Sequence, residues 1–170
     1  MISMTAPDRN EEPDLQRLIS DYGNSLLRMC FLYLKDIRLA EDAVQDTFVK
    51  VYTSYSQFEG KSSEKTWIMR IAINVCKNYL RSSWWRRIDG SVILENIPAE
   101  VHDFEDDTLL YQIIKLSSKY KEVLLLYYYQ DMKIREIAEV LQIPESTVSV
   151  RLKRARESLK GKLKGWCEDA

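Results

Sequence analysis

The stretch IREIAEVLQIPESTVSVRLKRARESL, residues 134–159, decides the fold of the C-terminal part of the chain. Apolar residues recur every three or four positions on both sides of its centre, which predicts a two-turn helix followed by a longer one. At the centre, Gln142 takes the turn position where glycine would ease a left-handed conformation. Ile143 is expected to fill the corner, and Pro144 suits the first turn of the second helix. This pattern predicts a helix-turn-helix, in which the second helix enters the major groove of DNA.

The second helix of this motif has an apolar stripe and, opposite it, a polar and cationic face. The stripe consists of Val148, Leu152, Ala155 and Leu159. Short polar side chains would let the other face sit deep in a groove, and lysine and arginine bond guanine edges or phosphates. An αα-hairpin that binds no nucleic acid is the alternative interpretation. The residues predicted to contact DNA are Glu145, Ser146, Ser149, Lys153 and Arg154, with Arg151 and Arg156 as flanking phosphate contacts.

The first 80 residues carry the same helical periodicity. Asp36 suits the N-cap of a second helix, whose buried stripe ends at Tyr55. Ser62 or Ser63 suits the N-cap of a third helix, which runs to about Leu80. No segment shows sustained strand alternation, so this part of the chain is predicted to be one compact helical domain.

An acidic segment, residues 89–105, has one proline and no helical period, and it is the best candidate for a linker. Periodicity resumes near Asp107, with Ser117 or Ser118 as the cap of the following helix. We therefore predict an all-α fold of two small helical domains joined by a flexible acidic linker, with a helix-turn-helix in the second. The expected divisions are a disordered tail at 1–11, a first domain at 12–86, the linker at 87–106 and a second domain at 107–170.

The total charge is a misleading guide to the partners of this chain. Its 170 residues hold 25 Lys and Arg against 26 Asp and Glu, a net charge of −1 that by itself argues against nucleic acid. Residues 60–88, however, hold seven bases against the single acid Glu64, and residues 123–170 are also net basic. Two basic blocks separated by acid leave a nucleic-acid partner open. Three widely spaced cysteines, a polar N-terminus and no long apolar run predict a reduced cytoplasmic protein without a signal peptide or membrane insertion.

The third predicted helix, EKTWIMRIAINVCKNYLR at residues 64–81, carries a mixed stripe between two apolar sides. Cations, amides and an aromatic ring along one stripe suit a nucleic-acid strand whose bases stack and whose phosphates are neutralised. The alternative for the tryptophan is a place in the core. The preceding loop could hold an extruded base through backbone amides and hydroxyl groups. The predicted stripe is Trp67, Arg70, Asn74, Lys77, Asn78 and Arg81, and the loop is Phe58, Glu59, Gly60, Lys61, Ser62 and Ser63.

The second predicted helix has an acidic face opposite its apolar stripe. The face consists of Glu41, Asp42, Gln45 and Asp46. Three interpretations stand: a solvated surface, a carboxylate metal site, or a docking surface for a basic partner. The metal site is the weakest, because such helical sites pair glutamate with histidine and the single histidine, His102, lies far away in the sequence.

These three surfaces, in this order, resemble those of the extracytoplasmic function (ECF, group IV) sigma factors of bacterial RNA polymerase, in the sigma-70 family. DIRLAEDAVQDTFVKVY resembles the family's segment for the β′ clamp helices of polymerase, which implies that role for Glu41, Asp42, Gln45 and Asp46. FEGKSSEKTWIMRIAINVCKNYLR resembles the segment that melts the promoter and recognises its −10 element. The helix-turn-helix resembles the domain that recognises the −35 element, with Ser149, Lys153 and Arg154 at the positions expected to contact bases.

The resemblance implies a dissociable initiation subunit of RNA polymerase with no catalytic residue, metal or cofactor. Its implied partners are core RNA polymerase, through the β′ clamp helices and the β flap, promoter DNA, and an anti-sigma factor that in this family is often membrane-bound. The alternative is a stand-alone helix-turn-helix regulator, which would explain residues 133–163 but leave the acidic face and the Trp67–Arg81 stripe without a purpose.

Overall fold

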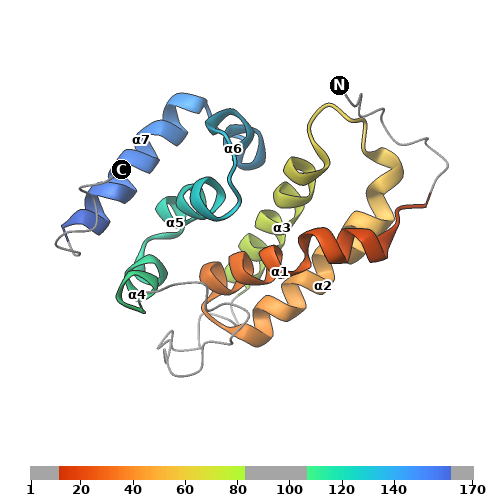
Figure 1. Ribbon diagram of the computed structural model, residues 1–170, viewed down its shortest axis with the longest axis horizontal. Helices are drawn as coiled ribbons and strands as arrows, with labels where there is room; N and C mark the ends of the chain where they lie inside the picture. The colour runs from red at the N-terminus through yellow and green to blue at the C-terminus, as the bar shows by residue number, and fades with distance from the viewer. Residues whose placement is uncertain (1–11, 83–106, 162–170) are drawn as a thin grey trace.

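The computed structural model describes residues 12–82 and 107–161, and every regular element in these ranges is a helix (Figure 1). The N-terminal half, residues 12–82, contains α1 (Leu15–Leu34), α2 (Ile37–Ser54), the short 3-10 turn η1 (Tyr55–Gln57) and α3 (Glu64–Arg81). The C-terminal half, residues 107–161, contains α4 (Asp107–Lys115), α5 (Ser118–Leu124), a π-helical segment (Leu125–Tyr129), α6 (Ile134–Leu141) and α7 (Glu145–Lys160). The all-α prediction is confirmed. The predicted tail at 1–11 and linker at 87–106 lie outside the described residues.

Short polar side chains begin the helices of the N-terminal half. Asp14 accepts from the backbone N–H of Arg17, and Asp36 accepts from that of Leu39, each at 3.0 Å. Ser63 accepts from the backbone N–H of Thr66 at 3.1 Å. These bonds satisfy N–H groups that a helix start leaves without a partner. The predicted caps Asp36 and Ser63 are thereby confirmed.

Two predictions about helix starts in the C-terminal half need correction. Ser117 does occupy the N-cap position of α5, but its side chain makes no capping hydrogen bond. Pro144 occupies the N-cap position of α7 rather than its first turn. In both cases the residue has an extended backbone, so it starts the helix through its main-chain conformation alone.

The core of the N-terminal half lies where α1, α2 and α3 pack against one another. Most of the predicted stripe of α2 is buried, including Thr47, whose hydroxyl donates to the carbonyl of Ala43 at 2.7 Å. Cys30 of α1 and Cys76 of α3 are fully buried free thiols with their Sγ atoms 3.5 Å apart. Their contact and burial raise the pKa of Cys30, so this thiol stays protonated.

The helix-turn-helix has the predicted form. α6 ends at Leu141, and its C-cap residue Gln142 adopts the left-handed conformation with φ of 55°. The whole predicted stripe of α7 is buried, namely Val148, Leu152, Ala155 and Leu159. Ala138 and Ile143 lie half-buried at the corner.

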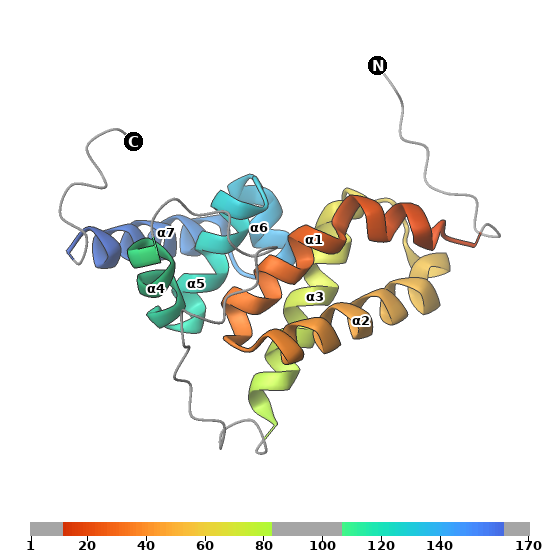
Figure 2. The same ribbon diagram turned by 60° about the horizontal axis from the view of Figure 1, so that its bottom comes forward.

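The two halves pack directly against each other. α3 contacts α6, and α1 contacts α4, α5 and the π-helical segment (Figure 2). The buried apolar residues of both halves form a single cluster. The two halves are therefore packed together, and we call this the closed arrangement.

Candidate nucleic-acid interface

An aromatic group joins the predicted base-binding loop to α3. The rings of Phe58 and Trp67 stack with centroids 5.0 Å apart and an interplanar angle of 29°. Tyr55 meets the edge of Trp67 with centroids 5.9 Å apart. Trp67 is half-buried, so its ring packs partly against the core and keeps part of its surface exposed. Gly60 has a φ of 67°, which explains why this turn of the loop favours a residue without a side chain.

The loop borders a hollow of about 360 Å³. Lys61, Ser62, Thr66, Trp67 and Arg70 line it from the N-terminal half. Glu139 and Gln142, from α6 and the turn after it, line it from the C-terminal half. The hollow has the cation, hydroxyl group and ring that base binding needs, and in the closed arrangement the C-terminal half forms one of its walls.

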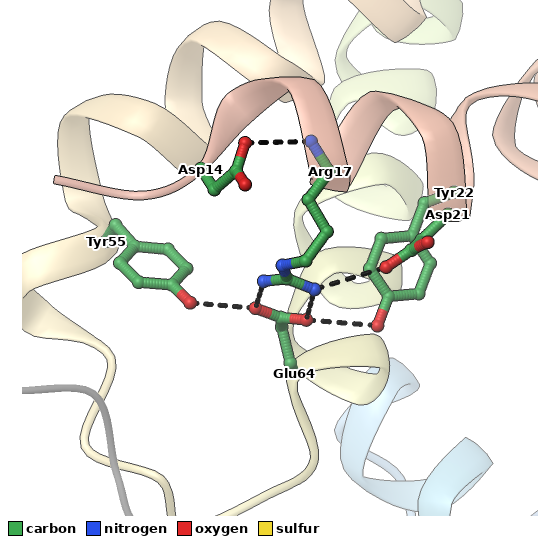
Figure 3. A network of polar contacts seen from close by, with 6 residues as sticks. All are labelled: Asp14, Arg17, Asp21, Tyr22, Tyr55 and Glu64. Atoms are coloured by element: carbon green, nitrogen blue, oxygen red, sulfur yellow. Dashed lines mark hydrogen bonds and ion pairs between the residues drawn. The ribbon is translucent and has the colours of Figure 1, made fainter.

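Glu64, the first residue of α3, holds the loop in place from its C-terminal end (Figure 3). Its carboxylate receives two bonds from the Arg17 guanidinium, at 2.7 and 3.0 Å. It also accepts from the hydroxyl groups of Tyr55 at 2.8 Å and Tyr22 at 3.1 Å. Because Tyr55 precedes the loop and Glu64 follows it, this network fixes both ends of residues 58–63.

The hydrogen bonds of this network help to determine the protonation states of its residues. Burial alone would raise the pKa of Glu64, but the bonds from Arg17 and Tyr55 outweigh burial and lower it from its ordinary value. Burial and the neighbouring carboxylate raise the pKa of Tyr22 and of Tyr55 to about 12. The carboxylate is therefore ionised and both phenols are protonated at neutral pH.

The predicted stripe of α3 is only partly free. Arg70, Asn74, Asn78 and Arg81 are exposed. Lys77 is half-buried, and its Nζ lies 3.3 Å from the Glu122 carboxylate of α5. The stripe from Arg70 to Arg81 is roughly 16 Å long at 1.5 Å per residue, which matches about five stacked nucleotides. Exposed amides and cations along that length can follow a single strand.

The predicted face of α7 is exposed over Glu145, Ser146, Ser149, Lys153 and Arg154. The two arginines predicted as flanking phosphate contacts already have partners. Arg151 lies 3.1 Å from Glu122, and Arg156 donates to the Tyr128 hydroxyl at 2.7 Å while lying over the Tyr127 and Tyr128 rings.

The acidic face of α2 is solvent-exposed at all four predicted residues, which are Glu41, Asp42, Gln45 and Asp46. Asp46 accepts from the Tyr79 hydroxyl of α3 at 2.7 Å. Burial and Asp46 raise the pKa of Tyr79, so this bond persists at neutral pH. Val49 and Tyr52, which the sequence reasoning missed, extend the face with exposed apolar surface, Val49 being 61% exposed.

Four further residues escaped the sequence reasoning: Glu64, Lys121, Glu122 and Gln130. Each is buried although charged or polar. Glu122 and Lys121 directly precede the apolar run 123–126, which is the one signal that could have placed them near the core.

The described parts of the chain, 12–82 and 107–161, contain no cluster of histidine, cysteine or acidic residues that could hold a metal ion. Within these same ranges, none of the helices combines the length and the apolar character required to cross a membrane.

Comparison with known proteins places both halves in one family. A family model described as sigma-70 region 2 matches residues 18–86, and one described as sigma-70, region 4 matches residues 107–159. The chain is 28% identical over 163 residues to the ECF RNA polymerase sigma factor SigW of Bacillus subtilis, covering 86% of this chain and 87% of that protein.

Two solved structures share the fold. The sigma factor RpoE in its complex with the anti-sigma factor NepR from Bartonella quintana gives a TM-score of 0.73 at 22% identity, covering 89% of this chain and 98% of that chain. CnrH in complex with the cytosolic domain of CnrY gives a TM-score of 0.68 at 24% identity, covering 90% and 89%.

Proposed function

The chain belongs to the sigma-70 family as an extracytoplasmic function sigma factor, and from this premise we propose how its surfaces divide the work of transcription initiation. Such a factor binds core RNA polymerase and directs promoter-specific initiation. We assign residues 12–86 to polymerase binding and the −10 element, residues 107–170 to the −35 element, and residues 87–106 to the linker.

The −10 element is captured by the loop 58–63 and the stripe of α3. A base leaves the stack and enters the hollow beside Trp67, where hydroxyl groups and Lys61 surround it. Arg70, Asn74 and Arg81 contact the single strand along the exposed stripe. The observation that carries this proposal is the alignment of an aromatic-lined hollow with exposed amides and cations on one helix.

The −35 element is recognised as duplex by α7. Lys153 and Arg154 are exposed, with the short side chains of Ser146 and Ser149 on the same helix. Short side chains allow the helix to sit deep in the major groove while the cations reach guanine edges and phosphates.

Polymerase docks on the acidic face of α2, with the β′ clamp helices as the proposed partner. Carboxylates at Glu41, Asp42 and Asp46 supply charge, and the exposed Val49 and Tyr52 supply apolar area beside them. A charged surface with an apolar neighbour is suited to protein docking. The β flap is the proposed contact of the C-terminal half.

We also infer an anti-sigma factor as a regulatory partner, in this family often held at the membrane. The two structural neighbours were each solved with another protein, NepR in one case and the cytosolic domain of CnrY in the other. The chain itself is proposed to act in the cytoplasm without catalysing a reaction.

The role of α3 is tested by run-off transcription with core polymerase on a promoter library. Asn74→Ala should lower open-complex formation about fivefold, since one hydrogen bond to the strand is worth about 1 kcal/mol. Asn24→Ala, an exposed asparagine of α1, is the matched control and should initiate normally. Equal losses in the two variants would contradict the assignment.

The role of α7 is tested on the same library by the pattern of promoters used. Lys153→Ala and Arg154→Ala should each cost about 1–3 kcal/mol of binding and relax the −35 preference while leaving the −10 preference intact. Lys160→Ala removes an exposed cation from the end of the same helix and should leave the preference unchanged. If both sets of variants, in α3 and in α7, lose activity identically on every promoter, the proposed division is wrong.

A stand-alone helix-turn-helix regulator is the rival function. It accounts for α6 and α7 but gives no role to the acidic face of α2. Co-purification with core polymerase separates the two, because a regulator that acts alone should not be retained.

A further inference from the structure

A cationic hollow of about 420 Å³ is lined by residues of α3, α5 and α7, together with residues of α1 and α6. Glu122 is the one acid among the described residues that line it, and it faces four basic side chains. The lining therefore carries a net positive charge. The four cations are Lys77 and Arg81 of α3, Lys119 of α5 and Arg151 of α7.

Glu122 compensates two of these cations and leaves the other two without an acid. Its carboxylate lies 3.3 Å from the Lys77 ammonium and 3.1 Å from the Arg151 guanidinium. Glu122 is only 4% exposed, so this cluster forms the floor of the hollow. Arg81 and Lys119 are exposed, and within the described parts of the chain no carboxylate forms an ion pair with either of them. These two side chains supply the uncompensated charge at the rim.

The charge of Arg81 reaches the floor of the hollow. Tyr33 is 3% exposed, and its hydroxyl donates to Oε2 of Glu122 at 3.3 Å. Burial and the Glu122 carboxylate raise the pKa of Tyr33, and the positive charge of Arg81 offsets part of this rise. The phenol is therefore protonated at neutral pH, and the Arg81 guanidinium lies close enough to act on it.

One side of the hollow is apolar. Leu80 of α3 is 38% exposed, and Leu141 and Ile143 line the hollow from α6 and the turn after it. Sites for small organic ligands combine apolar walls with a few polar groups that fix the orientation of the ligand. Their volumes are about 300–1,000 Å³, and the volume of this hollow lies within that range.

The cations of the hollow indicate a ligand with more than one negative charge. Guanidinium and ammonium groups bind phosphate oxygens through charge-assisted hydrogen bonds. Two linked phosphates supply enough charge for both Arg81 and Lys119, whereas a single carboxylate does not. Because Glu122 repels an anion that approaches the floor, the phosphates should lie at the rim. An organic group attached to them would then lie against Leu80.

We propose that this hollow binds a small organic diphosphate, with its phosphates between Arg81 and Lys119 and its organic group against Leu80. Glu122 lies below the ligand and does not contact it. One consequence rests on the proposed function, because Arg81 belongs to the stripe of α3 for the −10 strand. A ligand on Arg81 competes with that strand, so the diphosphate limits DNA binding.

The test measures the binding of two probes to the full chain by isothermal titration calorimetry in about 0.15 M salt. Pyrophosphate supplies two linked phosphates alone, and ADP supplies them with an organic group. Lys119→Gln removes a rim cation, and Leu80→Gln removes the exposed apolar side chain. Lys50→Gln, at an exposed lysine of α2, is the matched control for the change in charge. Far-UV circular dichroism establishes that each variant keeps its helices.

Both probes should bind the unmodified chain, and ADP should bind more tightly than pyrophosphate. Lys119→Gln should weaken both about tenfold, the loss expected for one charge-assisted hydrogen bond. Leu80→Gln should weaken the binding of ADP and leave that of pyrophosphate unchanged. Lys50→Gln should bind both probes as the unmodified chain does.

Three results would overturn the assignment. The first is that neither probe binds. The second is an equal loss in Lys119→Gln and Lys50→Gln, because the attraction would then depend on net charge alone. The third is an affinity for ADP that equals that for pyrophosphate and does not respond to Leu80→Gln, because the site would then not recognise an organic group.

Competition with DNA separates this site from the proposed function. A fluorescein-labelled single-stranded DNA of mixed sequence is titrated with and without ADP, and chloride keeps the ionic strength constant because salt alone weakens the binding of a strand. ADP should weaken strand binding, and Lys119→Gln should need about tenfold more ADP for the same effect, in line with its loss of affinity.

Two outcomes of the competition distinguish the sources of phosphate. If ADP binds as described and the strand still binds unchanged, the diphosphate site stands and the DNA role of Arg81 in the proposed function is wrong. If neither probe binds and Lys119→Gln weakens strand binding, the hollow takes a phosphate of the DNA backbone, and the site for a small diphosphate is overturned.

Discussion

Glu64 in the N-terminal half and Glu122 in the C-terminal half are both buried carboxylates held by an arginine and by tyrosine hydroxyl groups. They differ in where those partners come from. Arg17, Tyr22 and Tyr55 all lie in the same half as Glu64, so its network is complete whenever that half is folded. The partners of Glu122 come from both halves, so its contacts depend on how the halves meet.

The comparison separates a carboxylate that holds one half together from a carboxylate that joins the two halves. The bonds of Glu64 fix the ends of the loop 58–63 and keep the proposed base site in shape. The bonds of Glu122 depend on the contact between the halves, because Lys77 and Tyr33 lie in one half and Arg151 in the other. Lys121, which is buried beside Glu122 and repelled by Lys35 of the N-terminal half, adds an unfavourable charge to the contact between the halves.

The largest effect on folding is expected from Glu64→Gln. The substitution leaves Arg17 without its carboxylate and weakens two tyrosine bonds, so it should lower the free energy of unfolding by about 2 kcal/mol. Urea unfolding at neutral pH measures the loss. A change no larger than that of an exposed acid would show that the Glu64 network does not stabilise the N-terminal half.

The stability lost in Glu64→Gln is expected to depend on pH. Because the pKa of Glu64 is lower in the folded chain than its ordinary value of 4.5, its contribution is complete above that value and disappears as pH falls through the folded pKa. The gap in stability between the unmodified chain and Glu64→Gln should therefore shrink in acid. A gap that stays constant down to full protonation would contradict an ionised Glu64.

A feature of this structure could be predicted from the sequence when the residues that determine it are close together in the sequence. The helix-turn-helix was predictable because its determinants lie within 26 consecutive residues, and even the left-handed turn at Gln142 could be anticipated. Asp36 and Ser63 were predictable because a cap acts on N–H groups of the next turn. Phe48 is buried in α2, as its helical spacing on the apolar stripe predicts.

The buried polar contacts were not predictable because their partners are distant in the sequence. Glu64 and Arg17 are 47 positions apart, and Glu122 and Tyr33 are 89 apart. Nothing local distinguishes these glutamates from solvated ones. Most of the candidate DNA residues are exposed, but periodicity could not show that Lys77 and Arg151 share a carboxylate within the molecule.

The next largest effect is expected from Lys121→Met, as a change in pH dependence. Burial, and secondarily the charge of Lys35, lower the pKa of Lys121 to about 7. The unfolded chain then binds more protons than the folded one between about pH 7 and the ordinary value of 10.5, so stability rises with pH in that window. The slope from one such group is about 1.4 kcal/mol per pH unit.

The methionine side chain is nearly as long as the lysine side chain and carries no charge. Lys121→Met should be more stable than the unmodified chain at pH 7, and the difference should narrow towards pH 9. Thermal unfolding of both chains at pH 7 and pH 9 measures this difference in stability. The effects of groups that titrate in both chains cancel when one stability is subtracted from the other. A difference that does not change with pH would mean that Lys121 stays charged in the closed form.

The smallest effect is expected from Asp21→Asn, which tests whether burial is what makes the Glu64 network strong. Asp21 also bonds the Arg17 guanidinium, at 3.2 Å, but both side chains of this pair are largely exposed. Exposed pairs one helical turn apart contribute about 0.3–0.5 kcal/mol, and salt screens them. Urea unfolding in low salt should therefore detect a small loss that disappears in high salt, whereas the loss from Glu64→Gln should persist in both. If the two variants respond to salt alike, the distinction between a buried and an exposed partner of Arg17 does not govern the stability of this half.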